Sequence, residues 1–362
     1  MSLTHTSHAA RWFTLPRVNP VSIVLWAIRI LVIGVVVAGT IGTLANPRYT
    51  AAQWVDFVLF GLTIGAIYAQ IALGYTMVYG VLRLINFAHG DFVMAGAFAG
   101  YFVAQPLQRS GFLEQNAILG MTAILIVAVI TSVTIALLTE RIAYRPFRRV
   151  GGLAPLICAI GVSFFLEQTF RGMFGSAVKA YPQPQWERAS FDVFGFNVPH
   201  VYVLVIVLAV LFMAGLYLIV QRTRMGTAMR AVAEDPEAAA LMGIDANKVV
   251  VFTFVLGGAM AGIAGVFYAF VYKQVYFFMG FTPGIKAFGA AVLGGIGSIP
   301  GAMVGGVFLG LVESIGPTLF LDGLGIPAPY QLRDLIAFTL LIMVLIFRPH
   351  GLFGERMARQ RA

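Results

Sequence analysis

Cysteine and charge are both scarce in this chain. It has a single cysteine, Cys158, and only 11% of its 362 residues are Asp, Glu, Lys or Arg. One cysteine excludes an intrachain disulfide and a C-x-x-C metal cluster, which removes redox chemistry as the main function. Soluble domains carry about 25% charged residues, so this composition excludes a soluble protein with a single core. The sequence therefore predicts a chain that is embedded in a membrane.

Two kinds of binding motif are also missing. The chain has no G-x-x-x-x-G-K-[ST] segment, the loop that holds the phosphates of ATP in many ATPases. His89 has no second His or Cys at the spacing of a metal site, so we expect a structural role for it and no bound metal. The net charge of +9 could indicate a nucleic-acid partner, but the basic residues gather between apolar runs, as in cytoplasmic loops of membrane proteins. We expect no nucleic acid to bind.

Apolar residues and glycine are abundant instead. Hydrophobic residues make up 59% of the chain, and 40 residues are glycine. Apolar runs of about 20 residues without alternation favour helices over a barrel, because a backbone in lipid must satisfy its own hydrogen bonds. The predicted fold is all-α and polytopic, with about eight to ten transmembrane helices, some of them broken or re-entrant. The candidate spans are 21–44, 54–78, 85–104, 117–138, 152–172, 200–220, 249–272 and 333–347.

Pairs of small residues four apart recur in the second half of the chain. Such pairs let helix backbones approach closely in lipid, so they predict close helix crossings. The pairs are Gly258 with Gly262, Ala261 with Gly265, Gly301 with Gly305, and Gly306 with Gly310.

Three clusters of basic residues set the expected orientation. Cytoplasmic loops of membrane proteins are enriched in Lys and Arg, so these clusters and both termini are predicted to be cytoplasmic. The loop Gly172–Pro199 is then external. The stretch 285–320, broken by glycine and proline, must begin and end outside, which predicts an inserted hairpin of two short helices. The clusters consist of Arg141, Arg145, Arg148 and Arg149, then Arg222, Arg224, Arg230 and Lys248, then Arg348, Arg356, Arg359 and Arg361.

The chain divides into three parts. Residues 1–50 form a basic leader with an extra transmembrane helix, 51–353 form the main transmembrane domain, and 354–362 form a basic cytoplasmic tail. The leader could also be a signal peptide. Its apolar run of 24 residues exceeds the usual length of about 7–15, and no convincing small-x-small cleavage site follows Gly42. We therefore expect a retained span.

Polar residues interrupt the apolar segment Gly74–Phe102. Asn86 and Asp91 are costly at membrane depth unless they line a cavity or find a partner. Gly80 and Gly90 are places where the helix could unwind. This segment is the leading candidate for a translocation path. The alternative is a short solvated turn at the cytoplasmic interface that only connects two spans.

A second segment, Phe281–Gly295, is similar to the first. Both have F-x-x-G followed by a helix rich in Ala and Gly, as in Phe87–Gly100. The first begins on the cytoplasmic side and the second outside, as an inverted-topology repeat predicts, with substrate handled near the midplane. Chance similarity of Gly/Ala-rich sequence is the alternative. The residues predicted to form the substrate path are Asn86, Phe87, His89, Gly90, Asp91, Phe281, Gly284 and Glu313.

Two further carboxylates lie within apolar runs. Glu167 and Arg171 are four residues apart on one helix face, so we expect them to form an ion pair rather than to bind substrate. Glu313 has no evident local partner. Its carboxylate therefore needs either a positively charged partner from elsewhere in the chain or a cavity.

The charged island Gln221–Lys248 lies between two apolar runs and is predicted to form two short cytoplasmic helices. The segments Thr227–Val232 and Asp235–Met242 have helix-forming composition. Asp235 can cap the second segment, with proline at its first turn, and Gly243 can end it. Such helices, with small side chains outward, suit a partner's groove; an ordinary amphipathic interfacial helix is the alternative. The predicted coupling residues are Arg230, Ala231, Glu234, Asp235, Glu237, Ala238, Ala239 and Gly243.

Two segments carry a family resemblance: GLTIGAIYAQIALGYTMVYGVLRLINFAHGDFVMAGA and MGTAMRAVAEDPEAAALMGID. From about residue 57 to 353 the chain resembles the branched-chain amino-acid permeases of ABC importers, the high-affinity leucine, isoleucine and valine uptake systems. Glu237, Ala238, Ala239 and Gly243 reproduce the EAA-x-x-x-G core of the importer coupling motif, although the usual I-x-L-P continuation is absent.

The resemblance implies a permease subunit of a heteromeric importer in the bacterial inner membrane. The implied partners are a sister permease subunit, two cytoplasmic ATP-binding subunits, an external or periplasmic solute-binding protein and membrane lipids. The chain would be no enzyme and would bind no cofactor; the partner subunits would use ATP. It would move branched-chain or other hydrophobic amino acids by alternating access, with urea, amides or aromatic acids as alternative substrates. The alternative class is an ion-coupled secondary transporter or a channel, in which buried carboxylates act as relays.

Overall fold

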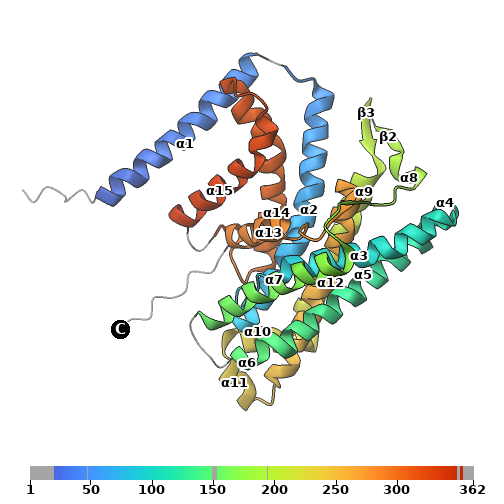
Figure 1. The fold of residues 1–362 in the computed structure, drawn as a ribbon. Coiled ribbons are helices and arrows are strands. Elements are labelled where there is room, and N and C mark those ends of the chain that lie inside the picture. Colours follow the sequence, from blue (N-terminus) through green and yellow to red (C-terminus); the bar gives the residue numbers. More distant parts are fainter. Residues whose placement is uncertain (1–19, 47, 149–152, 194, 349–350, 354–362) are drawn as a thin grey trace, which may run out of the picture.

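The computed structural model describes residues 20–46, 48–148, 153–193, 195–348 and 351–353, and these residues form a bundle of helices (Figure 1). The basic leader 1–19, the tail 354–362 and Arg149 lie outside the described residues. The first half contains α1 (Pro20–Ala45), α2 (Ala51–Leu82), α3 (His89–Arg109), α4 (Phe112–Gln115), α5 (Ala117–Thr139), the π-helix η1 (Glu140–Tyr144), α6 (Arg145–Phe147) and α7 (Ala154–Phe174).

The second half continues the helical pattern. It contains α8 (Gln185–Arg188), α9 (His200–Arg222), α10 (Arg224–Glu234), α11 (Pro236–Leu241), α12 (Ala246–Tyr272), α13 (Phe281–Gly294), α14 (Ile299–Gly316), the π-helix η2 (Pro317–Leu321), the 3-10 turns η3 (Asp322–Leu324) and η4 (Pro329–Leu332), and α15 (Arg333–Phe347). Two antiparallel pairs of short strands join β1 (Lys179–Ala180) to β4 (Gln274–Val275) and β2 (Ser190–Val193) to β3 (Phe196–Pro199). The predicted all-α fold is confirmed.

Among the described residues, eight helical segments are long and apolar enough to cross a membrane. Seven of them coincide with predicted spans to within a few residues. The remaining predicted span, 85–104, corresponds to α3, whose polar ends lower its hydropathy. Ile299–Leu324, in the second half of the predicted hairpin, is the eighth segment. The chain is therefore a multi-pass membrane protein.

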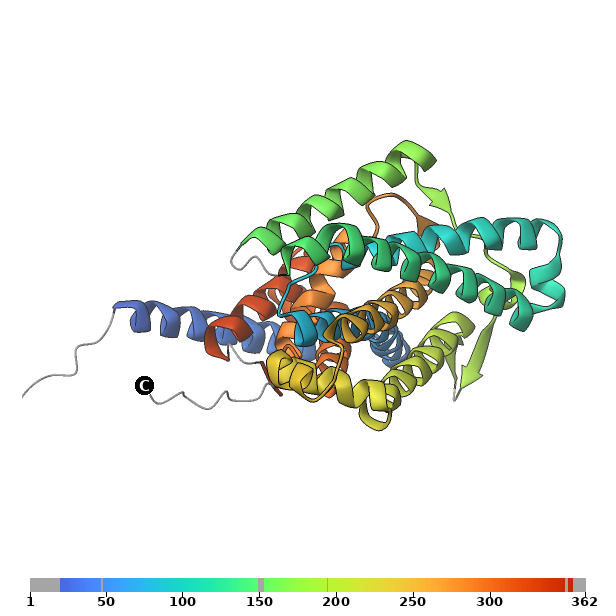
Figure 2. The same ribbon diagram turned by 90° about the horizontal axis from the view of Figure 1, so that it is seen from below.

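The centre of the bundle is formed by α2 and α12. In each of these helices 72% of the most apolar window is buried, compared with 6% for α1 and for the segment that contains α15. Because α2 packs along α14, α13 and α12, and α12 packs on α3 and α5, the two central helices hold the outer ones together (Figure 2). The outer helices expose apolar side chains, as expected for surfaces in contact with lipid.

The predicted small-residue crossings are present. A Cβ added at Gly262 would meet the carbonyl oxygen of Ala128 at 2.8 Å, where α12 crosses α5. Gly306 and Gly310 bring α14 against the backbone of Ala69 and Gly65 in α2, so closely that an added Cβ would overlap it. Glycine at these positions therefore sets the distance between helices.

The predicted hairpin consists of two helices, α13 with 14 residues and α14 with 18. The turn between them uses Gly295 and Gly297, whose φ angles of 104° and 99° favour glycine. Ser298 then caps α14 by accepting a hydrogen bond from the Gly301 N–H at 3.2 Å. The predicted pair of helices is therefore present, but only α13 is short, because α14 and the turns after it form a segment of 26 residues that is long enough to cross a membrane.

The extra helix α1 packs against the end of this hairpin. Thr43 donates a hydrogen bond to the carbonyl oxygen of Leu319 at 3.1 Å, and an added Cβ at Gly42 would overlap Gly323. Arg48 and Asp322 form an ion pair at 3.0 Å. From this anchor α1 runs outward with most of its surface exposed (Figure 1).

Candidate functional site

The predicted break in the first polar segment lies between α2 and α3. Helix α2 continues through Gly80 and ends at Leu82, so the prediction that it unwinds at Gly80 is wrong. Arg83 takes a left-handed conformation, with φ 54°, and its N–H still bonds the Tyr79 carbonyl oxygen at 2.8 Å. The six residues 83–88 connect the helices. The break is therefore set at the C-cap, where the chain turns out of the helix.

The polar residues after the break are buried. Asn86 and His89 are each 1% exposed, and Asp91 is 2% exposed. The alternative of a solvated connecting turn is therefore wrong for these three residues. Asn86 accepts a hydrogen bond from the Tyr144 hydroxyl at 2.5 Å, which fixes the linker to η1.

His89 packs among aromatic rings. Its ring centroid lies 4.8 Å from that of Tyr75 and 5.8 Å from that of Phe92. Within the described residues, no group of three or more His, Cys, Asp or Glu side chains is placed to hold a metal ion. These contacts agree with the structural role predicted for His89.

Helices α3 and α13 begin side by side. A Cβ added at Gly90 would meet the carbonyl oxygen of Gly280 at 2.5 Å, and one added at Gly284 would meet the Cα of Gly90 at 3.1 Å. The two similar sequence segments therefore meet at the N-termini of their helices, an arrangement that fits an inverted repeat. Any side chain larger than hydrogen at Gly90 or Gly280 would push the two helices apart.

A small cavity of about 60 Å³ lies at this junction. Helix α7 contributes Ser163, Phe164 and Glu167 to its lining. Asn86, His89 and Glu313 do not line it. Five of the eight residues predicted for the substrate path line it together: Phe87, Gly90, Asp91, Phe281 and Gly284.

The predicted ion pair between Glu167 and Arg171 is wrong. Glu167 is 3% exposed and lines the cavity, whereas Arg171 lies over the ring of Phe277, 5.5 Å from its centroid. Among the ion pairs of the described residues, none includes Glu167. Helical spacing would allow an ion pair, but Arg171 contacts the Phe277 ring and Glu167 faces the cavity, so the two side chains do not meet.

Glu313 has a partner that sequence reasoning missed. The Lys286 Nζ lies 2.6 Å from the Glu313 Oε1 and 2.6 Å from the Asp334 Oδ1. The Arg333 Nε is 3.7 Å from each of the same two carboxylates. Lys286 is 3% exposed and Glu313 is 4% exposed, whereas the Arg333 and Asp334 side chains are 35% and 48% exposed. This charge cluster therefore joins buried groups of α13 and α14 to the partly exposed start of α15. The sequence does contain a signal for this pair: one lysine and one glutamate lie in the same broken apolar stretch. Because charged side chains are costly at membrane depth, they are expected to pair with each other.

The two predicted loop helices form α10 and α11. Asp235 caps α11 by accepting hydrogen bonds from the Glu237 N–H at 2.9 Å and the Ala238 N–H at 3.0 Å. Gly243 follows the helix with φ 83°, a conformation that suits glycine. The predicted caps are therefore confirmed. Of the eight predicted coupling residues, Arg230, Glu234, Asp235, Glu237, Ala238 and Gly243 are exposed, Ala231 is half-buried and Ala239 is buried.

The outward face of α11 agrees with the prediction in part. Two small side chains, Ala238 and Ala240, are exposed as expected, whereas Ala239 is 4% exposed. Leu241 and Met242 are 89% and 83% exposed, so two large apolar side chains are also exposed at the end of α11. Arg230 donates a hydrogen bond to the carbonyl oxygen of Val220 and holds α10 against α9.

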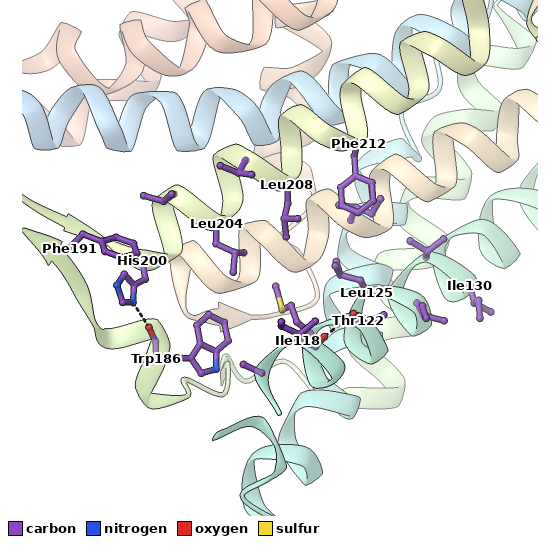
Figure 3. Close-up of a pocket in the computed structure, with 17 residues that line it drawn as sticks. Ile118, Thr122, Leu125, Ile130, Trp186, Phe191, His200, Leu204, Leu208 and Phe212 are labelled. Atoms are coloured by element: carbon purple, nitrogen blue, oxygen red, sulfur yellow. Dashed lines mark hydrogen bonds between the residues drawn. The ribbon is translucent and has the colours of Figure 1, made fainter. Parts of the chain in front are cut away.

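A larger apolar groove lies between α5 and α9, over α12 (Figure 3). Its volume is about 840 Å³, and aliphatic and aromatic side chains such as Leu125, Leu204 and Phe212 line it. Of its polar side chains, Thr122 and His200 make hydrogen bonds, to the Ile118 carbonyl at 2.8 Å and with the Trp186 carbonyl at 3.0 Å. The Trp186 indole N–H is buried and has no hydrogen-bond partner. The groove therefore suits hydrocarbon and offers no charge for a zwitterion.

Comparison with known proteins adds to this geometry. The family model "Branched-chain amino acid transport system / permease component" matches residues 57–345. The high-affinity branched-chain amino acid transport system permease protein BraD of Pseudomonas aeruginosa is 42% identical over 298 residues, 82% of this chain and 94% of that protein. LivH of Escherichia coli, with the same description, is 38% identical over the same shares.

A more distant relative comes from an archaeon. The probable branched-chain amino acid transport permease protein LivH of Methanocaldococcus jannaschii is 28% identical over 285 residues, 78% of this chain and 87% of that protein. No solved structure matches the chain. The family match begins at residue 57, after α1, so the extra helix lies outside the matched family region. The chain belongs to the permease-component family of branched-chain amino acid transport systems.

Proposed function

We propose that this chain is a permease subunit of an ATP-driven importer that carries branched-chain or other hydrophobic amino acids across the membrane. The relatives' names and the family description support the substrate class. The observation that carries the ATP-driven part is α11, a capped short helix that presents Leu241 and Met242 at its exposed end. An exposed apolar pair on a rigid helix is suited to a partner's groove.

The proposed complex contains a sister permease subunit, two ATP-binding subunits below α10 and α11, and an external solute-binding protein. This arrangement places the loop 221–248 and both termini in the cytoplasm, with the chain in the inner membrane. The basic residues beside the loop, such as Arg222 and Arg224, support this orientation. ATP is used by the partner subunits, and this chain holds no cofactor.

Alternating access follows from the connections of the loop. Helix α10 packs on α9, α2 and α12, so a movement of the loop reaches the central helices. The junction of α3 and α13, with its small cavity, is the narrow point that such a movement would open. Seven of the eight predicted path residues lie at or near this junction. The eighth, Glu313, belongs to the charge cluster that joins α13, α14 and α15.

A docking experiment tests the ATP-driven part. The ATP-binding subunits are co-purified with the wild-type chain, with the double variant Leu241→Arg/Met242→Arg and with Phe191→Arg. Phe191 is a matched control, because it is 49% exposed but lies in β2, away from the loop. The expected result is loss of the ATP-binding subunits from the double variant alone. Equal recovery with all three chains would contradict the proposal.

A further inference from the structure

Two carboxylates line the cavity at the α3–α13 junction without a cation. Asp91 and Glu167 are 2% and 3% exposed, and no Lys or Arg belongs to the lining. Among the described residues, neither carboxylate takes part in an ion pair. A buried carboxylate is costly unless a proton, a cation or hydrogen-bond donors compensate it. No cation of the described residues therefore compensates the two carboxylates.

The helix dipole does not give every oxygen of Asp91 a hydrogen-bond partner. An acidic residue in the first turn of a helix interacts favourably with the helix dipole, and Asp91 occupies that turn of α3. An ordinary capping residue would bond the first N–H groups, but α3 has no side-chain cap. The Asp91 Oδ2 is fully buried and has no hydrogen-bond partner. Its free oxygen therefore points to a ligand.

The N-termini of two helices carry partial positive charge at the same cavity. Gly90 in the first turn of α3 and Gly280 at the N-cap of α13 both line the cavity. Helices α3 and α13 have 21 and 14 residues, long enough for a full dipole. Helix N-termini attract anions such as carboxylates. One small cavity thus combines two anionic side chains with two electropositive helix ends.

We propose that this junction binds the zwitterionic head group of an α-amino acid. The ammonium group binds the Asp91 and Glu167 carboxylates with the Ser163 hydroxyl, and the carboxylate binds the N-terminal turns of α3 and α13. This inference rests on the proposed function, and it names the part of the substrate that the permease itself recognises.

The size of the cavity agrees with a head group alone. One water needs about 10–15 Å³ of accessible volume, so 60 Å³ has room for several water-sized groups. The apolar side chain of the substrate then lies outside the cavity, against the rings of Phe87, Phe164 and Phe281, which form part of the same wall. Opening the contact between Gly90 and Gly280 makes room for it. Aliphatic side chains of different shapes would then share one head-group site.

Import into proteoliposomes tests the inference. The assay uses the whole complex with its solute-binding protein and labelled L-leucine, at saturating binding protein. Asp91→Asn removes the charge at constant size, Asp91→Glu keeps it, and Asp56→Asn changes an exposed carboxylate of α2 as the control. Because a hydrogen bond to a charged group contributes roughly 1.5–3 kcal/mol, Asp91→Asn should slow import about ten- to a hundredfold. Asp91→Glu should import faster than Asp91→Asn, and Asp56→Asn should equal wild type.

Several results would overturn the inference. One is import by Asp91→Asn at the wild-type rate, and another is an equal loss in Asp91→Glu, which would make shape decisive rather than charge. Wild-type import that requires Na⁺ or a proton gradient would assign the cavity to that cation instead. If the Asp91→Asn complex fails to assemble, import is measured with Glu167→Gln instead. Import by Glu167→Gln at the wild-type rate would also overturn the inference. Failure of the wild-type complex to import leucine would instead contradict the proposed function.

Discussion

Arg83 at the end of α2 donates a hydrogen bond to the carbonyl oxygen of Ala233 in α10, with an Nη2 to oxygen distance of 3.0 Å. Arg83 has φ 54°, a conformation that costs free energy for any residue with a side chain. The contact joins the loop 221–248 to the point where the chain leaves α2 and enters the linker 83–88. It is a direct link between the proposed ATPase docking loop and the junction of α3 and α13.

Replacing Arg83 should weaken this link. Arg83→Met removes the hydrogen bond to Ala233 and keeps most of the side-chain length. The expected result is a several-fold fall in leucine imported per ATP hydrolysed, measured on the same proteoliposomes. Arg145→Met, at an exposed position of α6, is the control. An unchanged ratio in Arg83→Met would show that the link plays no part in coupling.

Replacing Gly306 should separate α14 from α2. Gly306→Leu forces a side chain into the backbone of Ala69, and overpacking of this kind costs about 1–3 kcal/mol. The expected result is a lower melting temperature of the detergent-purified chain. Gly215→Leu in α9 is the matched control, because an added Cβ there meets nothing within 4 Å. Equal melting temperatures for the two variants would contradict the proposed role of the glycine.

Lys286→Met should remove the nearest cation from the buried Glu313 and leave only the Arg333 Nε, 3.7 Å away, as its partner. Breaking a buried ion pair by removing one partner costs about 3–5 kcal/mol. We expect a large loss of thermal stability, partly restored in Lys286→Met/Glu313→Gln, where no buried charge remains at the pair. Lys248→Met, at a side chain that is 79% exposed, should have no measurable effect. If the double variant were less stable than Lys286→Met, the electrostatic explanation would be wrong.

Stability should also depend on pH through Glu187 in α8, which lies outside the candidate spans. Burial raises the pKa of this carboxyl from 4.5 to about 7, although Lys273 and Arg188 oppose the shift. The folded chain therefore keeps a proton that the unfolded chain loses above pH 4.5. The free energy of unfolding should fall as pH rises from about 4.5 to 7 and then level off, by up to about 3 kcal/mol.

The matching experiment compares melting temperatures at pH 5 and pH 8. Glu187→Gln should reduce the difference between the two, because its side chain carries no titrating proton. Glu114→Gln is the control at another carboxylate of the same region, whose oxygen accepts a hydrogen bond from the Gln185 N–H at 2.9 Å. A pH dependence unchanged in Glu187→Gln would assign it to other groups.

Local patterns predicted local structure well. The apolar runs located the long helices to within a few residues, and Asp235 and Gly243 marked the ends of α11 as their chemistry requires. The small-residue pairs around Gly262 and Gly306 predicted close crossings, because few other reasons place small residues four apart in an apolar helix.

Contacts between distant segments could not be predicted from local patterns. Helical spacing predicts that Glu167 pairs with Arg171, but Glu167 lines a cavity formed by α3, α7 and α13. The partner of Glu313 is Lys286, 27 residues earlier, and only the folding of the hairpin brings the two together. The break in the first polar segment occurs at Arg83 rather than at Gly80, because the linker is fixed by tertiary contacts such as Asn86 with Tyr144.

ATP-dependent uptake tests the central claim most directly. Proteoliposomes that contain this chain, its permease and ATP-binding partners and the external binding protein are loaded with ATP or with a non-hydrolysable analogue, and labelled L-leucine is added outside. We predict that leucine accumulates against its gradient only with ATP. The same accumulation without hydrolysis, driven by Na⁺ or protons, would contradict the account.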